Sequence, residues 1–394
     1  MNGVLKGIRV LDFGRYIAGP YCATLLADLG AEVIRVERLQ GSEDRFLASV
    51  APTGEGGTFL QMARNKLGLT LDPMKPEAAE VVRRLVASAD VVVANLPAPT
   101  LKAMGLDYET LRAIKPDIIL THVSAFGADG PYAERVGFDL LGQAMSGMMY
   151  LSGTVDAPIR SQVPYVDFST AAFAAFGTLA ALMERSRTGR GQIVEASLYA
   201  SALALSNNFT IEEGVLGLER QPHGNRAFHH APNDVFRTRD GHLITMVVGN
   251  PLFARWAKLV GVPEWIGDPR FDSDQKRGEN GALISARMAD WCAARTTAQA
   301  LAEMEAARVP AGPVYTPRQT LDDPHTRARG IFKSIDYPGL PRPAPVAETP
   351  VRLSETPGGI RQRPPTLGEH TALILEQLGF TAAEVEDLRS AEVV

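Results

Sequence analysis

Residues 7–37 read GIRVLDFGRYIAGPYCATLLADLGAEVIRVE, and this stretch decides the fold. Residues 8–13 are an apolar run typical of a buried strand, and residues 21–29 have the pattern of a helix that ends at Gly30. Residues 32–36 form a second apolar run. A strand, a helix and a strand at this spacing predict a βαβ crossover within a buried parallel sheet. The expected fold class is therefore open α/β.

The same alternation continues along the chain. Residues 76–87 have a helical pattern, and residues 90–94 and 117–123 have strand patterns. Residues 168–187 form an Ala- and Phe-rich helical stretch, and a helix that is apolar on nearly every face must be buried in a large core or against a partner chain. We therefore expect a large Rossmann-like domain over residues 1–216.

The composition changes after residue 216. Residues 217–232 are a polar loop rich in Gly, Pro, His and Arg, and a hairpin pattern with amphipathic helices follows it. This change predicts a smaller α+β domain over residues 217–330. Residues 331–394 begin with a Pro-rich extended stretch, and we expect this segment to return to the large domain.

Composition excludes several classes of protein. The 394 residues have a net charge of −5, whereas nucleic-acid binders are usually basic. The two cysteines, Cys22 and Cys292, are far apart, and the histidines are scattered, which argues against a disulfide scaffold and a metal site. The longest charge-free runs have about sixteen residues, fewer than the ~20 that span a bilayer, and no apolar signal sequence opens the chain. We expect a cytoplasmic protein without a membrane partner.

The first strand–helix turn, residues 14–20, is a candidate ligand site because α/β sheets bind ligands at their strand ends. Glu37 follows it at about the distance that is typical of a nicotinamide-cofactor site. However, G-x-G-x-x-G is absent, so an oxidoreductase is a weak alternative. Arg38 suits a different role, as a fork-shaped donor to a phosphate at the rim of the sheet.

Asp167 directly precedes the buried helical stretch, and its position fits two roles. It is either an N-cap that accepts hydrogen bonds from the helix N–H groups or a nucleophile. In the second role, the helix dipole would keep its carboxylate ionised, and neighbouring backbone N–H groups would hold a developing oxyanion.

The sequence resembles the family III coenzyme A transferases, the CaiB/BaiF family, whose members include formyl-CoA and carnitine-type transferases. The resemblance extends in order over almost the whole chain, and its motifs are specific. The matching motifs are residues 7–13, 18–20, 29–37, 65–66, 127–132, 139, 143–147, 166–167, 184–192, 224–225, 231–232, 309–313 and 367–371.

The resemblance implies a homodimer in which the two chains are interlocked like links. It also implies that Asp167 attacks an acyl-CoA thioester and forms an aspartyl anhydride and then an aspartyl-CoA thioester, from which an acceptor acid takes the CoA. No permanently bound cofactor is implied, because CoA and acyl-CoA are substrates. The CoA-contact positions implied by the motifs are Ala18, Arg38, Leu71, Asn95, Leu96, Phe126 and Gly127.

Departures from the family pattern concern the substrate. Ile17 stands where formyl-CoA transferase has a glutamine, which argues against a very small acid such as oxalate. A loop with Asn225, Arg226 and His229 replaces the Gly-rich flap of that enzyme. We interpret Ile17 and these three residues as substrate contacts, and the positive charge of the loop suits the second carboxylate of a dicarboxylic acid such as succinate.

Two alternatives remain within this resemblance. A 2-methylacyl-CoA racemase needs a histidine where Phe138 stands, and phenylalanine cannot transfer a proton. The neighbouring Asp139 is then a structural residue, a cap or a buried hydrogen-bond acceptor. A catalytically silent acyl-CoA binding protein would keep the fold without turnover, and the presence of Asp167 argues against it.

Overall fold

A computed structural model describes residues 3–394, and the chain divides into two compact units. The first unit extends to Gly147 and also includes Ser161–Val215 and Arg327–Val394. The second unit consists of Met148–Arg160 and Leu216–Thr326. The thirteen-residue stretch 148–160 therefore packs with the second unit although it precedes Asp167 in sequence.

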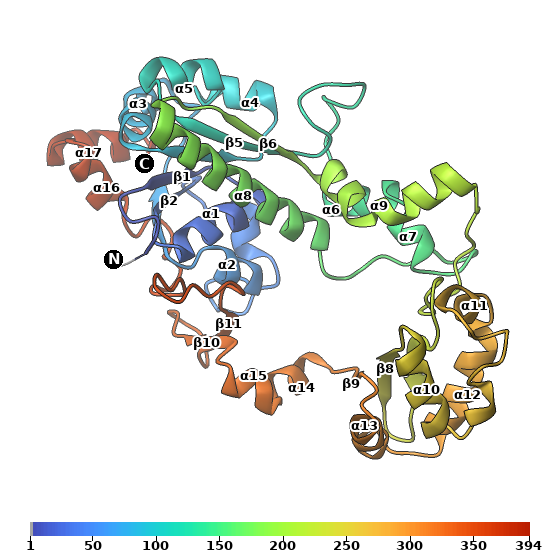
Figure 1. Cartoon of the computed structure of the whole chain (residues 1–394). Coiled ribbons are helices and arrows are strands. Elements are labelled where there is room, and N and C mark those ends of the chain that lie inside the picture. Colours follow the sequence, from blue (N-terminus) through green and yellow to red (C-terminus); the bar gives the residue numbers. More distant parts are fainter. Residues whose placement is uncertain (1–2) are drawn as a thin grey trace. The chain divides into compact units, whose positions relative to one another are not determined.

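A six-stranded parallel sheet forms the centre of the first unit (Figure 1). Its strands follow the order β3-β2-β1-β4-β5-β6, so the predicted open α/β fold is confirmed. Neighbouring strands pair in parallel throughout, for example Val10 of β1 with Val33 of β2. The strands are β1 (Arg9–Asp12), β2 (Glu32–Glu37), β3 (Lys66–Thr70), β4 (Val91–Ala94), β5 (Ile119–Ser124) and β6 (Ile193–Ser197).

Helices cover both faces of the sheet because alternate strand residues are apolar on each side. Leu11 and Val92 belong to one buried cluster, together with the helices α3 (Ala79–Ser88), α4 (Ala98–Ala103), α5 (Tyr108–Ile114), α16 (Thr371–Gln377) and α17 (Ala382–Ser390). Val10 and Val93 belong to the cluster on the opposite face. The helices of that second face are α1 (Ala18–Asp28), α8 (Tyr165–Thr188) and the start of α9 (Leu198–Leu216).

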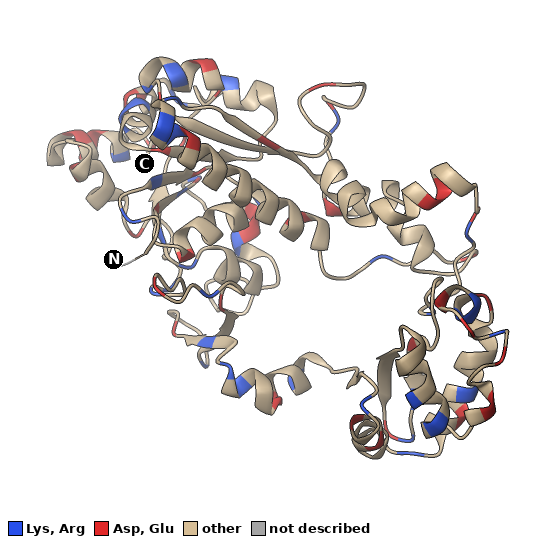
Figure 2. Cartoon of the chain, in the orientation of Figure 1, with Lys and Arg blue, Asp and Glu red and all other residues tan. Residues whose placement is uncertain are grey.

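The predicted apolar helix is α8. Few charged residues lie in the middle of α8 or along most of α9 (Figure 2). Within residues 3–394, α8 alone is long and apolar enough to cross a membrane by length and composition, a test that buried core helices also pass. Its small residues Ala171, Ala174 and Ala181 are buried against the sheet and α1. On its other side, Phe176 and Met183 are exposed in the single chain.

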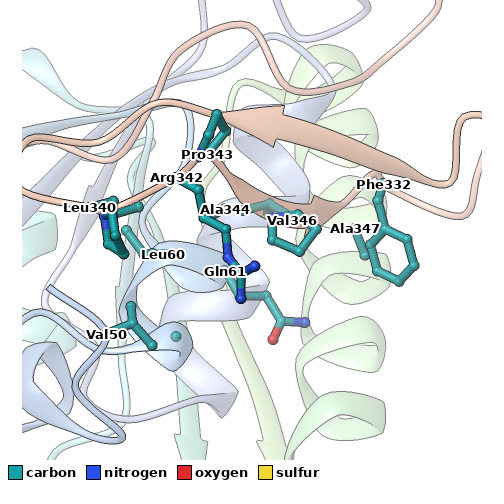
Figure 3. Close-up of a pocket in the computed structure, with 13 residues that line it drawn as sticks. Val50, Leu60, Gln61, Phe332, Leu340, Arg342, Pro343, Ala344, Val346 and Ala347 are labelled. Carbon is teal, nitrogen blue, oxygen red and sulfur yellow. The ribbon is translucent and has the colours of Figure 1, made fainter. Parts of the chain in front are cut away.

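Short elements complete the first unit. They are the 3₁₀ helices η1 (Glu43–Phe46) and η2 (Pro76–Ala78), the helices α2 (Gly57–Met62) and α6 (Asp139–Met145), and a hairpin of β10 (Phe332–Ile335) and β11 (Ala344–Ala347). A hollow of about 570 Å³ lies between α2 and this hairpin and is lined by Val50, Leu60, Phe332 and Val346 among others (Figure 3). None of the predicted site residues lines it.

The second unit is built on an antiparallel sheet of β7 (Asn233–Arg237), β8 (His242–Met246) and β9 (Ala311–Pro313). Trp256, Phe253 and Met288 belong to its own apolar core. Its helices are α7 (Met148–Leu151), α10 (Asn250–Leu259), η3 (Pro263–Trp265), α11 (Asp274–Glu279), α12 (Gly281–Ala293), α13 (Thr297–Ala306) and α14 (Pro317–Asp322), and α15 (Pro324–Ala328) follows at its boundary.

Charged side chains are buried at the β1–β2–β3 side of the sheet. Lys66 Nζ lies 2.8 Å from Asp12 Oδ2, and Arg35 Nη2 lies 2.6 Å from Asp44 Oδ2. A third buried pair joins the end of α1 to the segment before β3: Arg64 Nη2 lies 2.7 Å from Asp28 Oδ2. Burying an ion is costly unless a partner and hydrogen bonds compensate it, so each of these pairs holds its elements in one arrangement.

Arg64→Met tests the Asp28–Arg64 pair. Both side chains are almost fully buried, so the substitution leaves the Asp28 carboxylate without its ion-pair partner. We expect the free energy of unfolding to fall by about 3–5 kcal/mol. Urea denaturation followed by circular dichroism measures this change, with Arg83→Met in the exposed Arg83–Glu80 pair as the control that changes little. Equal, small effects of both substitutions would contradict this account.

Candidate active site

The predicted CoA-contact residues follow the ends of five successive strands. Because the strands are parallel, their carboxyl ends lie along one edge of the sheet, and the loops after β1 and β4 flank the point where the strand order reverses. Open α/β sheets bind ligands at this point. Ala18 follows β1, Arg38 follows β2, Leu71 follows β3, Asn95 and Leu96 follow β4, and Phe126 and Gly127 follow β5. Ile17, a predicted substrate contact, lies next to Ala18 in the turn after β1.

The side chains of these residues differ in what they offer a ligand. Ala18 and Leu71 are buried in the core, so their backbone groups would make any contact. Arg38 is exposed, and its Nη1 lies 2.7 Å from Glu43 Oε1. Glu37, by contrast, is buried, and Arg45 Nη2 lies 2.5 Å from its Oε2. Although burial alone would raise the pKa of Glu37, Arg35 and Arg45 lower it to about 2.

Glu37 therefore belongs to a buried ion pair and is not free to bind a ribose. The nicotinamide alternative loses the acidic residue on which it rested.

Asn95 orders the first strand–helix turn. Its Oδ1 accepts a hydrogen bond from Arg15 N at 2.7 Å, and its Nδ2 donates to Arg15 O at 2.8 Å. The next residue, Leu96, accepts a hydrogen bond through its carbonyl from His122 Nε2 at 2.9 Å. These two residues thus connect β4 to both neighbouring strands, a role that the sequence motif did not reveal.

Gly127 turns the chain after β5. Its φ of +104° favours glycine, and a Cβ there would lie 3.2 Å from Glu195 Oε1. Gly127 N donates to Ser124 Oγ at 2.9 Å. Beside it, the Phe126 ring packs edge-on against Tyr132 and Tyr199. The turn is therefore rigid, with an aromatic surface at the same edge of the sheet.

Asp167 is the third residue of α8, whose N-cap is Pro164, a residue without a capping side chain. Asp139 supplies the cap instead: its Oδ2 accepts hydrogen bonds from Val166 N at 2.8 Å and from Asp167 N at 3.1 Å. The interpretation of Asp139 as a structural residue is confirmed, and the N-cap interpretation of Asp167 is wrong. The expectation that neighbouring backbone N–H groups hold a developing oxyanion is corrected as well. The N–H groups of Val166 and Asp167 already donate to Asp139.

Gln143 holds Asp139 in place. Its Nε2 donates to Asp139 Oδ1, and its Oε1 accepts a hydrogen bond from Ser161 N at 2.9 Å. Both side chains lie in α6 and are buried. Sequence reasoning missed the role of Gln143, although its spacing of four residues from Asp139 places both side chains on one face of a helix.

The Asp167 carboxylate is buried, with 9% of the residue exposed, and within residues 3–394 its oxygens make no hydrogen bond. Burial raises the pKa of Asp167 to about 7, and the nearby charge of Asp139 adds to the shift. Dipole-assisted ionisation was expected, but loss of water outweighs it here. A carboxylate in such a site is largely shielded from water, and no hydrogen bond within the described residues restrains its oxygens.

Three of the predicted substrate contacts lie in the second unit, whereas Ile17 lies in the first. Asn225 is exposed, and Arg226 and His229 are half-buried. The Arg226 side chain packs over Gly281, where a Cβ would lie 3.2 Å from its Cδ. Arg220 Nη2 lies 3.5 Å from His229 Nδ1, so a second arginine of the loop lies beside one of the predicted residues. Within the described residues, no three His, Cys, Asp or Glu side chains converge on a point where a metal ion could bind.

Fold and site together define a class: doubly wound α/β enzymes with a carboxylate at the ligand-binding edge of the sheet. Comparisons with known proteins narrow this class. The sequence profile of CoA-transferase family III matches residues 5–371. The chain is similar to the succinyl-CoA–D-citramalate CoA-transferase of Chloroflexus aurantiacus, at 37% identity over 394 residues, covering 99% of this chain and 98% of the relative.

Two further proteins are similar over nearly their whole length. The beta subunit of the succinyl-CoA–L-malate CoA-transferase of Chloroflexus aurantiacus is 34% identical, covering 99% of this chain and 98% of the relative. The crystal structure of a CaiB/BaiF family protein from Brucella suis superposes with a TM-score of 0.84 at 34% identity, covering 96% of this chain and 100% of that one. The chain therefore belongs to the family III CoA-transferases.

Asp167→Asn tests the electrostatic account of the site through stability. The pKa of Asp167 is about 7 in the folded protein and near 3.8 in the unfolded chain, so the wild type loses stability as pH rises from about 4 to 7. The asparagine side chain does not ionise, so the variant does not lose stability in this way as pH rises. We expect the two to be similarly stable near pH 4 and the variant to be more stable by up to about 4 kcal/mol at pH 8.

Urea unfolding of both proteins from pH 4 to pH 8 measures this difference. Parallel stability curves for wild type and variant would contradict the raised pKa of Asp167.

Proposed function

We propose that this CoA-transferase moves CoA from succinyl-CoA to a second dicarboxylic acid through covalent intermediates on Asp167. The observation that supports the proposal best is the Asp167 carboxylate, which is buried and without hydrogen bonds, at a helix start whose N–H groups Asp139 satisfies. Succinyl-CoA is proposed as the donor because the names of two relatives include it.

The reaction passes through two anhydrides on Asp167, one with succinate and one with the acceptor acid. A carboxylate oxygen of Asp167 attacks the thioester carbonyl of succinyl-CoA, and the C–S bond breaks to release CoA thiolate. The thiolate then attacks the aspartyl carbonyl of the anhydride, which releases succinate and leaves an aspartyl-CoA thioester. An acceptor carboxylate attacks this thioester and displaces the thiolate again. The thiolate finally attacks the acceptor carbonyl, giving the new acyl-CoA and free Asp167.

The surroundings of Asp167 favour the first attack. Its oxygens need not break a hydrogen bond within the protein before they reach the thioester carbonyl. Since the pKa of Asp167 is near 7, a large share of the side chain is already ionised at neutral pH.

CoA lies along the carboxyl edge of the sheet in this proposal. Arg38 binds a phosphate with its guanidinium fork, which would replace the exposed pair with Glu43. The backbone near Ala18, Leu71, Asn95 and Leu96 and the turn at Phe126 and Gly127 form the remaining contacts.

The acceptor is a dicarboxylic acid in this proposal. One carboxylate reacts at Asp167, and we propose Ile17, Asn225, Arg226 and His229 as further contacts of the acid. Support comes from the positive charge of the loop that carries the last three of these residues.

The active form is proposed to be a cytoplasmic homodimer. A second copy of the chain would cover the exposed apolar residues of α8 and α9, which include Phe176, Met183 and Val215.

Mass spectrometry of the intact protein tests the covalent pathway. Incubation with succinyl-CoA, followed by quenching with hydroxylamine or borohydride, should change the mass of the wild type. Peptide mapping should place the change on Asp167, because the thioester and the anhydride both form there. Acetyl-CoA, which lacks the second carboxylate, should label the protein less.

Asp167→Ala is the matched variant. It should bind CoA as the wild type does and show no adduct and no turnover. Adding a dicarboxylic acid to the isolated CoA adduct should release that acid as its CoA thioester. A wild type that binds succinyl-CoA but forms no adduct and no product with any acid would overturn the proposal and favour a silent acyl-CoA binding protein.

A further inference from the structure

Arg38 and Glu43 form an ion pair in the loop after β2, next to the proposed CoA site. Arg38 Nη1 lies 2.7 Å from Glu43 Oε1, and the two side chains are 60% and 49% exposed. Within residues 3–394, neither side chain has a second ion-pair or hydrogen-bond partner. An ion pair in such an exposed position contributes little to folding, because water solvates both charges well. The stability of the fold therefore does not account for this pair.

Buried groups fix the loop that carries the pair. Glu37, which directly precedes the arginine, is buried, and its Oε1 accepts a hydrogen bond from Ser42 N at 3.3 Å. Asp44, which directly follows the glutamate, is also buried, and its Oδ2 lies 2.6 Å from Arg35 Nη2. Because these contacts join β2 to η1, the loop keeps the two members of the exposed pair close together whether or not a ligand is bound.

The guanidinium group of Arg38 is the one that the proposed function assigns to a phosphate of CoA. A phosphate that takes both N–H groups of the fork must displace the Glu43 carboxylate, because the two anions use the same donors. Binding then gives up the contact at 2.7 Å. The free energy of the pair is therefore subtracted from the free energy of CoA binding.

We infer that Glu43 is an intramolecular competitor of the CoA phosphate, which weakens CoA binding and speeds the release of the product. This inference rests on the proposed function, in which Arg38 binds that phosphate. The donor and the product carry the same CoA moiety, so contacts with it bind both equally and do not accelerate the chemistry. Since every turnover ends with the release of an acyl-CoA, a weaker contact at Arg38 favours turnover.

Glu43→Gln tests this inference, because glutamine keeps the size of the side chain and removes its charge. Isothermal titration calorimetry at low ionic strength measures the Kd for CoA. The variant should bind CoA roughly threefold more tightly than the wild type, the factor that an exposed ion pair of this kind is worth. Stopped-flow displacement of bound CoA should show that the gain lies mainly in slower dissociation.

Arg38→Met shows whether the gain depends on the arginine. Alone, this substitution should weaken CoA binding. Adding Glu43→Gln to it should then bring little of the gain, because no guanidinium group is left for the two anions to share.

Dephospho-CoA identifies which phosphate Arg38 binds. A gain in Glu43→Gln that persists with dephospho-CoA assigns the diphosphate to Arg38, whereas a gain that is seen with CoA alone assigns the 3′-phosphate.

Glu184→Gln is the matched control. Glu184 forms a similarly exposed pair with Arg187, at 2.7 Å, near the end of α8. Because α8 returns the chain to the start of β6, this pair lies toward the edge of the sheet opposite the proposed CoA site. The control should leave the Kd for CoA unchanged.

An unchanged Kd in Glu43→Gln would overturn the inference, and so would weaker binding, since Glu43 would then orient Arg38 for the ligand. A gain of the same size in Glu184→Gln or in the Arg38→Met background would overturn it too, because it would mark a general effect of charge. Wild-type turnover and the Asp167 adduct are measured on the same preparation. A wild type without either would overturn the proposed function itself, whereas an active wild type with any of these results would overturn this inference alone.

Discussion

The first backbone N–H groups of a buried helix must be paired with hydrogen-bond acceptors. The acceptor that α8 uses determines the surroundings of the Asp167 carboxylate. Its N-cap, Pro164, offers no side-chain acceptor, so Asp139 of α6 supplies one carboxylate oxygen to two backbone N–H groups. Gln143 holds the other oxygen of Asp139. Because the cap comes from a different helix, the carboxylate of Asp167 does not have to accept hydrogen bonds from the first N–H groups of α8. It stays buried, close to a like charge and free of hydrogen bonds.

The parallel sheet determines where the start of α8 and the ligand-binding loops lie. Its parallel strands end along one edge, and α8 must begin near that edge because it returns the chain to the start of β6, which is parallel to β5. Buried ion pairs such as Asp12–Lys66 fix the strands on one side, and Asn95 fixes the turn after β1. A rigid ligand edge and a helix start with an unbonded carboxylate are thus consequences of one topology.

Much of this arrangement follows from the sequence. The strand–helix spacing of residues 7–37 predicts the sheet, the motifs predict the family, and the absence of a histidine at Phe138 leaves Asp139 to a structural role. The pKa of Asp167 does not follow, because it depends on burial and on a charge 28 residues away in sequence. The hydrogen bonds of Asn95 and Gln143 join distant segments and require coordinates.

The pH dependence of the first covalent step tests the central claim most directly, namely that Asp167 is a buried, unbonded nucleophile. In rapid-quench experiments with saturating succinyl-CoA, the rate of adduct formation on Asp167 should rise about tenfold per pH unit below 7 and level off above it, because only the ionised carboxylate attacks. A rate that is constant from pH 5 to pH 8 would show a carboxylate with an ordinary pKa and would contradict the account.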